Sequence, residues 1–542
     1  MDMEKRSNSF VKGAAILAIA GLIVKIIGAF FRIPLANLIG VDGMRYYEIV
    51  YPYYSFLLAV SSAGLPTAIS KTVAERVTFG DYHGARAVFK DAFLLLSGIG
   101  IVTSLTMYFG AHAIAGFTSS PEAFRSFQAL SPALFLVSIM CVYRGYLQGM
   151  QQMTGTAVSQ VAEQVGKLAF GLYLGVKLLW RGPDYAAMGA IIGVTISEFL
   201  GLAVIWLFYM SKRRQFARAI RHSEKRSYAR GVFVKPLLLI AIPITIGASI
   251  SSLSGMVDGA LIIRTLTNNL GFSESTAGNA YSLLRANVTT LVNMPGVLTM
   301  ALAVSLVPAI SAYVAKKDFK RAKVAARLGM KLALIIGLPC AVGLFVLSKP
   351  VLLLLYPTLT GSQLSLASEL LKTASVGVIF LSLVQSMTGV IQGLGKPSIP
   401  VFNLFIGFVL KVVVMLILMN IPSINIQGAA VSTVVCYAFA GIADTVYTVR
   451  KTGMRLDIFD SLVKPAAASL VMGLAASVIN NLLEAAGHER LGAIVGVLVG
   501  VLIYAALMLL LGMFSPEELD MIPGGNKIRA LLKRFQKRPK KA

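Results

Sequence analysis

About fourteen apolar runs follow one another along the chain, and this repetition constrains the fold more strongly than any other feature of the sequence. An α-helix needs about 20 predominantly apolar residues to cross a hydrocarbon core, and most of the runs have that length. A helix also satisfies its own backbone polar groups, which a bilayer cannot do. We therefore predict an all-α integral membrane protein with about fourteen transmembrane helices. The predicted spans are 13–39, 47–70, 88–113, 126–149, 155–180, 186–211, 236–263, 280–312, 325–348, 370–394, 398–420, 427–449, 465–483 and 491–513.

Composition agrees with a membrane protein and excludes other classes. Hydrophobic residues make up 56% of the 542 residues, charged residues 14%, and the mean hydropathy is +0.75. The formal charge of +26 predicts no nucleic-acid partner, because the basic residues lie between apolar runs and not on a water-soluble face. The three cysteines lie far apart in apolar segments and the four histidines are scattered, so we expect neither a disulfide framework nor a metal site.

Lys and Arg are distributed unequally between alternate connecting segments. With the N-terminus inside, 36 of the 50 basic residues lie in inside segments and seven in outside segments. Basic segments stay on the cytoplasmic side, so both termini are predicted to be cytoplasmic. The richest inside segments are the linker 212–235 and the tail 514–542. The end of the tail has no acid and could form an amphipathic helix on the anionic inner leaflet or a solvated extension. The first apolar run is expected to be a retained span and not a cleaved signal.

The chain also shows signs of an internal duplication. A displacement of 244 residues aligns YRGYLQGM (143–150) with MTGVIQGL (387–394), and Lys167 with Lys411. AVSSAGLPTAIS (59–70) resembles AVSLVPAIS (303–311) at an offset of 237 to 242. An even number of helices per repeat predicts parallel repeats. We expect a six-helix N-lobe (1–211), the basic linker 212–235, a six-helix C-lobe (236–450), two extra helices (451–513) and the tail 514–542.

Several of these segments resemble a known superfamily. GLIVKIIGAFFRIPLANLIG, YPYYSFLLAVSSAGLPTAISKTVAE, GDYHGARAVF, YRGYLQG, VAEQVGK and VNMPGVLTMALAVSLVPAIS are similar to sequences of the MOP (multidrug/oligosaccharidyl-lipid/polysaccharide) exporters, with a MATE/MOP-like fold. Within them the chain resembles MurJ-type lipid II flippases and stage V sporulation protein B-like polysaccharide transporters. The resemblance implies a multi-pass protein of the bacterial cell membrane with two lobes around a cationic cavity. It implies alternating access that carries an undecaprenyl-pyrophosphate-linked sugar outward, with the lipid tail in a groove beside the two extra helices.

Three basic residues within spans are candidates for binding that substrate: Lys25, Arg32 and Arg285. Each costs roughly 2.5–3.5 kcal/mol at the centre of a spanning helix unless it is compensated. Lys25 and Arg32 are seven residues apart and share a helix face. A pyrophosphate would suit them, because guanidinium groups bind phosphate oxygens bidentately and an ammonium acts as a point charge. The resemblance implies basic substrate ligands on helices 1 and 8. The alternative is that Lys25 or Arg32 snorkels or pairs with a buried carboxylate such as Asp258.

Few acids lie within the spans. Asp258, Asn403 and Asp444 could supply oxygen ligands for a coupling Na⁺ or carry H⁺, and the resemblance implies a cation site in the second lobe. The alternative is that Asp258 neutralises a helix 1 cation and that Asp444 lies near a membrane surface. Glu163 and Lys167 are four residues apart in the favourable order and are interpreted as a structural pair.

These features favour a flippase for a lipid II-like precursor, with another lipid-linked polysaccharide as a further substrate class. A cation-coupled MATE-like exporter of small molecules is the alternative within the same fold. Connecting segments of no more than about 30 residues leave no room for a catalytic domain, so we expect no enzyme, no catalytic residues and no cofactor other than a coupling ion. The expected partners are the lipid-linked oligosaccharide and membrane lipids, and we expect a monomer.

Overall fold

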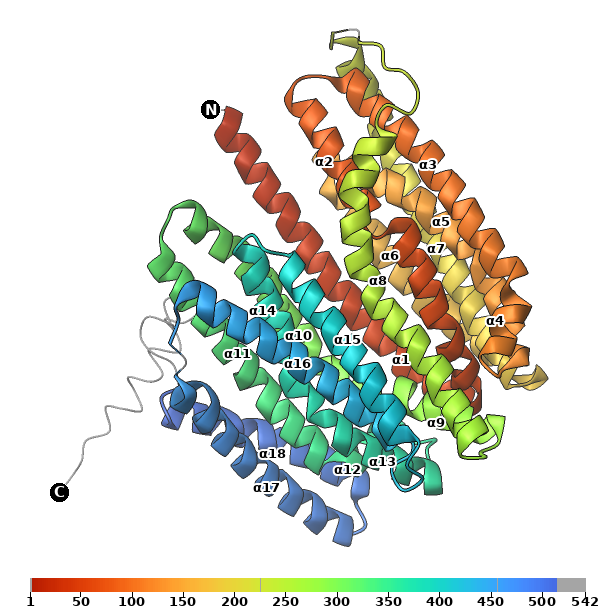
Figure 1. The fold of residues 1–542 in the computed structure, drawn as a ribbon, viewed down its shortest axis with the longest axis vertical. Coiled ribbons are helices and arrows are strands. Elements are labelled where there is room, and N and C mark those ends of the chain that lie inside the picture. The colour runs from red at the N-terminus through yellow and green to blue at the C-terminus, as the bar shows by residue number, and fades with distance from the viewer. Residues whose placement is uncertain (1, 225, 456, 514–542) are drawn as a thin grey trace, which may run out of the picture. The chain divides into compact units, whose positions relative to one another are not determined.

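The apolar runs form helices, as their length predicts. The structure, a computed structural model, describes residues 2–224, 226–455 and 457–513, and this part of the chain contains no β-strand. The chain divides into two compact units, Met1–Ser282 and Leu283–Ala542. Figure 1 shows the first from red to yellow-green and the second from green to blue.

The elements of the first unit are α1 (Asp2–Ser62), α2 (Leu65–Thr78), α3 (Tyr82–Phe109), α4 (Ala111–Phe117), η1 (Pro121–Ala123), α5 (Phe124–Gly149), α6 (Met153–Leu178), η2 (Leu179–Arg181), α7 (Pro183–Arg221), α8 (Val234–Arg264), η3 (Thr265–Asn269) and α9 (Glu274–Ser282). Those of the second are η4 (Leu283–Val288), α10 (Thr289–Ala315), α11 (Phe319–Val346), α12 (Ser348–Leu355), α13 (Gly361–Ser375), α14 (Gly377–Gly393), α15 (Ser398–Met419), α16 (Gln427–Thr452), η5 (Phe459–Val463), α17 (Lys464–Ala485) and α18 (Glu489–Leu510).

The first two predicted spans join without a loop. α1 continues through Gly40, whose backbone is not helical (φ 70°, ψ −179°). Only glycine adopts this conformation without strain, which explains why a glycine separates the two halves of α1. The next break follows at Gly64, where a Cβ atom would lie 2.2 Å from the backbone oxygen of Ala241 in α8. Pro66 lies in the first turn of α2, where a proline needs no backbone donor.

The first unit is a bundle in which α3, α5, α6 and α7 pack side by side, with α1 against α6, α7 and α8. Its interior includes Ile69, Val88 and Leu96, which are fully buried and pack with residues of α5 and α8. The helices α8 and α9 pack against α1, so residues 236–282 belong to this unit. The boundary between the compact units lies at Ser282, and the predicted lobe boundaries at 211 and 236 stay a prediction.

Two buried carboxylates hold the basic linker against the first unit. Asp81 caps α3 by accepting a 2.7 Å hydrogen bond from the backbone of Gly84, and it also accepts one from the hydroxyl of Tyr228 in the linker. Asp91 accepts hydrogen bonds of 3.0 and 3.1 Å from the backbone of Gly231 and Phe233, just before α8. The end of the linker is therefore a docked segment with defined hydrogen bonds.

In the second unit, α14 packs against α10, α11 and α16, and α15 packs against α16. α17 and α18 pack against each other, and α17 also packs along α11. Figure 1 shows this pair in blue at the edge of the unit. The two helices without a counterpart in the sequence repeat are thus added to the side of the second unit.

Equivalent contacts inside the two units support the duplication. A Cβ on Gly100 would meet the side chain of Ser138 at 2.8 Å, and one on Gly337 would meet that of Ser382 at 2.9 Å. These glycines are 237 residues apart and the serines 244. α5 and α14 also end in the same turn, with Gln151 at φ 61° and Gly395 at φ 81°. Each of these turn residues donates its backbone N–H to the residue three positions earlier.

The predicted number of fourteen spans is not confirmed. Among the described residues, eleven helices are long and apolar enough to cross a membrane, or twelve if α13 and α14, bent by 44°, form one span. One of the eleven, Ile19–Thr78, contains two predicted spans, and α6 is not among them. The predicted amphipathic or solvated tail 514–542 lies outside the described residues.

Candidate functional site

Arg32 forms a close ion pair within α1 of the first unit. Its guanidinium lies 2.7 Å from a carboxylate oxygen of Glu48, whose side chain is completely buried. The arginine side chain is 25% exposed. The break at Gly40 turns the second half of α1 so that residues 16 positions apart meet. The structure therefore shows a buried carboxylate that neutralises Arg32, and this acid is Glu48.

Lys25 lies two helical turns before Arg32, and its environment differs. It is exposed, between the exposed apolar residues Ile23 and Ile26. No acidic side chain among the described residues forms an ion pair with it. Lys25 is therefore a cation within an apolar helix that no described side chain of its own unit neutralises.

A third cation, Lys167 of α6, lies among aromatic rings of α1. Its ammonium donates a 2.9 Å hydrogen bond to the hydroxyl of Tyr51. It lies 4.7 Å from the centre of the Tyr51 ring and 5.0 Å from that of Phe31, and Tyr47 stacks on Tyr51. Such contacts stabilise a cation away from water. The predicted pair of Lys167 with Glu163 does not form, because both side chains have other partners.

Glu163 pairs with Arg144 of α5 instead. The two side chains approach to 3.0 Å, and Arg144 also donates a 2.7 Å hydrogen bond to Ser159. On α7, the buried Glu198 accepts a 3.5 Å hydrogen bond from the hydroxyl of Tyr54. The polar interior of the first unit therefore contains both acids and bases, and most of the contacts join different helices.

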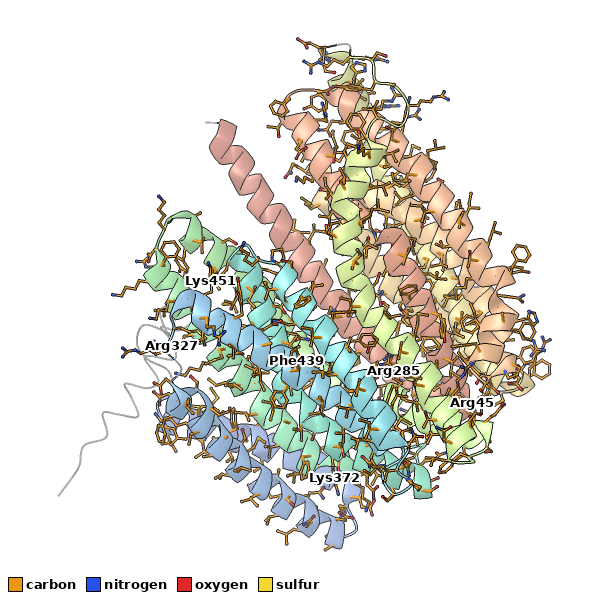
Figure 2. The ribbon with its side chains drawn as sticks, viewed as in Figure 1. Arg45, Arg285, Arg327, Lys372, Phe439 and Lys451 are labelled. Atoms are coloured by element: carbon orange, nitrogen blue, oxygen red, sulfur yellow. The ribbon has the colours of Figure 1, made fainter. Side chains whose placement is uncertain are left out.

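Arg285, the third predicted substrate ligand, lies in the second unit. It is part of the π-helical segment η4, which continues from α9 into α10, and its side chain is half-buried (Figure 2). π-Helical turns occur frequently at functional sites. Since Lys25 and Arg32 belong to the first unit, the convergence of the three cations on one cavity stays a prediction.

Two of the three predicted coupling residues are in contact. The amide nitrogen of Asn403 donates a 2.7 Å hydrogen bond to Asp444, which is completely buried between α15 and α16. Asp258 is buried in α8 of the first unit. Asn403 presents its amino group to the carboxylate, so a sodium ion would require the amide to turn its oxygen inward.

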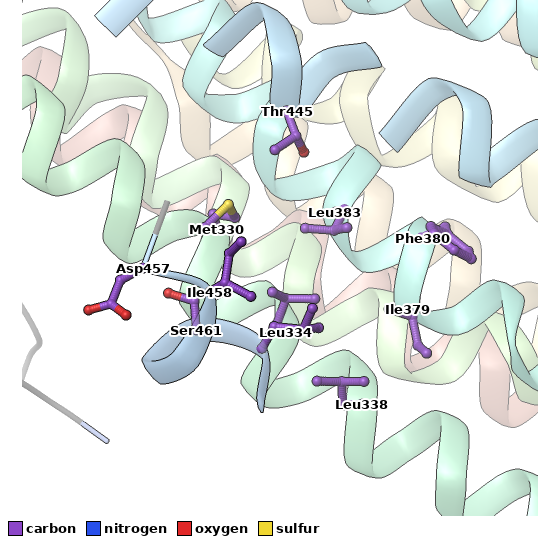
Figure 3. Close-up of a pocket in the computed structure, with 11 residues that line it drawn as sticks. Met330, Leu334, Leu338, Ile379, Phe380, Leu383, Thr445, Asp457, Ile458 and Ser461 are labelled. Atoms are coloured by element: carbon purple, nitrogen blue, oxygen red, sulfur yellow. The ribbon is translucent and has the colours of Figure 1, made fainter. Parts of the chain in front are cut away.

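The second unit contains an apolar cavity of about 400 Å³ between α11, α14, α16 and η5. Figure 3 shows leucine, isoleucine and phenylalanine side chains around it, with Asp457 at its edge. Ile458, Ser461 and Leu462, which lead into the first extra helix, form part of the wall. A cavity with this lining suits a hydrocarbon chain.

Comparison with known proteins places the chain in a family. Residues 10–314 match the model of the family described as "Polysaccharide biosynthesis protein". The chain belongs to this family. Residues 286–417 of this polysaccharide biosynthesis family member also match the MatE model.

Relatives of similar length come from Bacillus subtilis (strain 168). Stage V sporulation protein B is 25% identical over 95% of this chain and 98% of its own length. Lipid II flippase MurJ is 25% identical over 87% of this chain and 89% of its own length. An uncharacterized membrane protein, YabM, is 27% identical over 96% of both chains.

Solved structures show the same fold. A MATE multidrug transporter of the MOP superfamily in an inward-facing conformation has a TM-score of 0.65 and 15% identity, covering 79% of this chain and 94% of its own. Lipid II flippase MurJ in an inward closed conformation has a TM-score of 0.63 and 16% identity, covering 92% of this chain and 98% of its own. The family member is thus a multi-span membrane protein with the MOP-superfamily fold.

Sequence reasoning missed two residues of the first unit. Glu48 lies at the edge of a predicted span, where an acid costs little, and its burial depends on the loop-free turn at Gly40. Arg144 lies within the predicted span 126–149, but its partner Glu163 is on another helix. The sequence feature that could have identified the pair is that Arg144 and Glu163 are both charged residues within apolar runs, where opposite charges tend to pair.

Proposed function

We propose that this protein is an alternating-access flippase that moves an undecaprenyl-pyrophosphate-linked sugar, a lipid II-like precursor, from the inner to the outer leaflet of a bacterial plasma membrane. It acts as a monomer with both termini in the cytoplasm. The names of the relatives support a lipid-linked substrate, since one is a lipid II flippase and the family is described by polysaccharide biosynthesis. No covalent chemistry and no catalytic residue is part of this proposal.

The observation that carries the proposal is the environment of Lys25. An ammonium within an apolar helix is costly unless an anion or water surrounds it. Among the described side chains no acid pairs with Lys25, whereas Arg32 on the same face has Glu48. The pyrophosphate of the substrate would supply the missing anion, and Arg32 and Arg285 would add bidentate contacts. A cationic pocket also attracts an anionic substrate over a distance.

The apolar cavity of the second unit supports the lipid part of the proposal. Its apolar wall and its position beside η5 suit a segment of the prenyl chain. The cavity volume of about 400 Å³ accommodates part of a long isoprenoid, so the remainder would extend into the bilayer.

Ion coupling belongs to the same proposal. Asp444 with Asn403, together with Asp258, would bind a Na⁺ ion or carry H⁺ during the transport cycle. The contact between Asn403 and Asp444 supports their joint role. An Asp258→Asn variant that still folds should lose the ion dependence of transport.

The test is complementation of a strain depleted of its lipid II flippase. The wild-type protein should restore growth, and Lys25→Ala should not, although its membrane abundance on an immunoblot stays normal. Lys177→Ala is a matched control, because this lysine is in contact with Tyr173 on its own helix α6. Failure of the wild-type protein to complement, or full activity of Lys25→Ala, would contradict the proposal.

The match of residues 286–417 to the MatE model favours a second candidate, a cation-coupled exporter of small molecules. Drug export would persist when lipid-linked precursors are absent. Resistance to cationic dyes in a strain that expresses the protein, combined with failure to complement, would favour this function.

A further inference from the structure

Glu198 of α7 is a buried acid for which the proposed transport cycle gives no role. The residue is 7% exposed, and one of its carboxylate oxygens accepts the hydrogen bond from Tyr54. The other oxygen, Oε2, is buried and has no hydrogen-bond partner among the described residues. An ionised carboxylate in such a position loses its hydration without replacement, which costs several kcal/mol.

The nearby arginine is already engaged. Arg144 contacts Glu163 at 3.0 Å and Ser159 at 2.7 Å, and the second oxygen of Glu163 accepts a 3.1 Å hydrogen bond from Gln164. Both oxygens of Glu163 are therefore satisfied, in contrast to those of Glu198. Gly201 lies one turn along α7 from Glu198. A Cβ atom placed on Gly201 would lie 3.3 Å from the side chain of Glu163, so the two acids are close to each other.

Every helix packed around Glu198 contributes a titratable or charged group. These groups are Tyr54 of α1, Cys141 and Arg144 of α5, and Glu163 and Lys167 of α6. Glu163 repels a second negative charge, while Lys167 is held by Tyr51 and its neighbouring rings. Arg144 is thus near both Glu163 and Glu198, and in the structure it pairs with Glu163.

We propose that Glu198 is a proton-binding site of the first unit, separate from Asp258, Asn403 and Asp444. Its carboxylate binds one proton from water in the arrangement of the structure, in which it is buried, and it returns that proton to water in an arrangement that hydrates the site. No other bond forms or breaks. A proton suits the site better than a metal cation does, because a sodium ion needs several oxygen ligands and would lie beside the positive charge of Arg144.

The site also explains how the proton could be linked to helix movement. Once Glu198 loses its proton, it competes with Glu163 for Arg144, which connects α5 to α6 in the structure. Protonation therefore favours one of two arrangements of the same arginine, and a ligand shifts an equilibrium by its difference in affinity for two states. The role in coupling rests on the proposed flippase function, whereas proton binding does not.

The first experiment is infrared spectroscopy of the purified protein in nanodiscs, without substrate, over a range of pH. The wild-type protein should show a carbonyl stretch from a protonated buried carboxyl group that disappears as the pH rises. Glu198→Gln should remove this component, and the control Glu75→Gln should keep it, since Glu75 is an exposed residue of α2. The titration should not change when sodium is added. If the difference spectrum between the wild-type protein and Glu198→Gln contains no such component, the proposal is overturned.

Two further variants keep the test decisive. Glu163→Gln frees Arg144 for Glu198, so the component should titrate at a lower pH, and an unchanged titration would contradict the competition for Arg144. If Glu198→Gln does not fold, Tyr54→Phe removes only the hydroxyl that bonds Glu198 and should shift the carbonyl stretch. The absence of any shift would then count against Glu198 as the origin of the component.

A transport arm separates this inference from the proposed function. In proteoliposomes, an imposed pH gradient should accelerate lipid II flipping by the wild-type protein and have no effect on Glu198→Gln. If the wild-type protein does not flip lipid II, the proposed function fails, while the infrared result still decides whether Glu198 binds a proton.

Discussion

Arg32 and Glu48 form an ion pair whose two members are exposed to different degrees. The glutamate side chain is 0% exposed and the arginine side chain 25% exposed. Removal of one partner of a buried pair leaves an uncompensated charge, which typically costs about 3–5 kcal/mol, whereas removal of both is often tolerated. Arg32 therefore stabilises the fold as well as being a candidate ligand, and an alanine variant alone cannot distinguish the two roles.

We expect Arg32→Gln to lower the amount of folded protein in the membrane, because Glu48 stays buried without its partner. The double variant Arg32→Gln with Glu48→Gln should restore that amount and still fail in complementation. Fluorescence-detected size-exclusion chromatography measures the folded fraction. Complementation by the double variant would show that Arg32 has a structural role only.

Asp81 is a residue whose charge holds the linker. Burial raises the pKa of its carboxyl, but hydrogen bonds from Tyr228 and Gly84 and the positive charge of Arg76 outweigh this effect, and the pKa lies below its ordinary value. A lowered folded-state pKa stabilises the docked linker above the ordinary carboxyl pKa of about 4, and the contribution is lost as the pH falls through the folded-state value.

Asp81→Asn should therefore release the linker at neutral pH. Loss of hydrogen bonds to a charged group costs about 1.5–3 kcal/mol, which corresponds to at least about tenfold faster trypsin cleavage at the exposed Arg226 and Arg230. Asp318→Asn is the control, because Asp318 caps α11 through the backbone of Arg321 in the same way. Equal cleavage of the two variants would refute the docking role.

At the scale of helices, close packing depends on glycine. A Cβ on Gly193 of α7 would lie 2.3 Å from the backbone nitrogen of Gly171 in α6. The spacing of four residues between Gly171 and Gly175, and between Gly189 and Gly193, is typical of close helix contact, but it does not identify which helices meet. The spacing of residues is a local property, whereas the partner helix is set by tertiary packing.

Gly193→Ala should force α6 and α7 apart and lower the free energy of unfolding by about 1–3 kcal/mol or more. Gly98→Ala on α3 is the matched control, because no heavy atom lies within 4 Å of its Cβ position, and it should be neutral or stabilise the helix by about 0.5–1 kcal/mol. Thermal unfolding in detergent compares the two. A normal melting temperature for Gly193→Ala would mean that the helices accommodate the methyl group.

At the scale of the whole molecule, the sequence predicted the fold class and the location of most spans, because these follow from hydropathy. The duplication inferred from internal similarity stays a prediction that the equivalent contacts support. The contacts between polar side chains are harder to predict from the sequence. Lys167 has Glu163 four residues away, yet it bonds Tyr51 of another helix. Glu48 was not recognised as buried, since its position depends on the turn at Gly40. The spacing of residues along the sequence does not reveal which side chains on different helices form a pair.

Parallel repeats predict that the turns after α5 and α14 are on the same side of the membrane. Gln151→Cys and Lys396→Cys, each in a chain whose native cysteines are replaced, place one thiol in each exposed turn. Both should react with a membrane-impermeant maleimide only after the cytoplasmic face is opened. Labelling of the two positions from opposite faces would refute both the parallel arrangement and the predicted orientation.

The boundary between the two units lies inside a helical stretch and not in the basic linker. Asp81 and Asp91 fix that linker to the first unit, and the chain enters the second unit at Leu283, where η4 begins. In the proposed alternating-access cycle, a change in the relative position of the units would therefore have to change the backbone of this π-helical segment. Arg285 is part of that segment, so binding of the proposed pyrophosphate there would restrict the conformational freedom of the chain that connects the units.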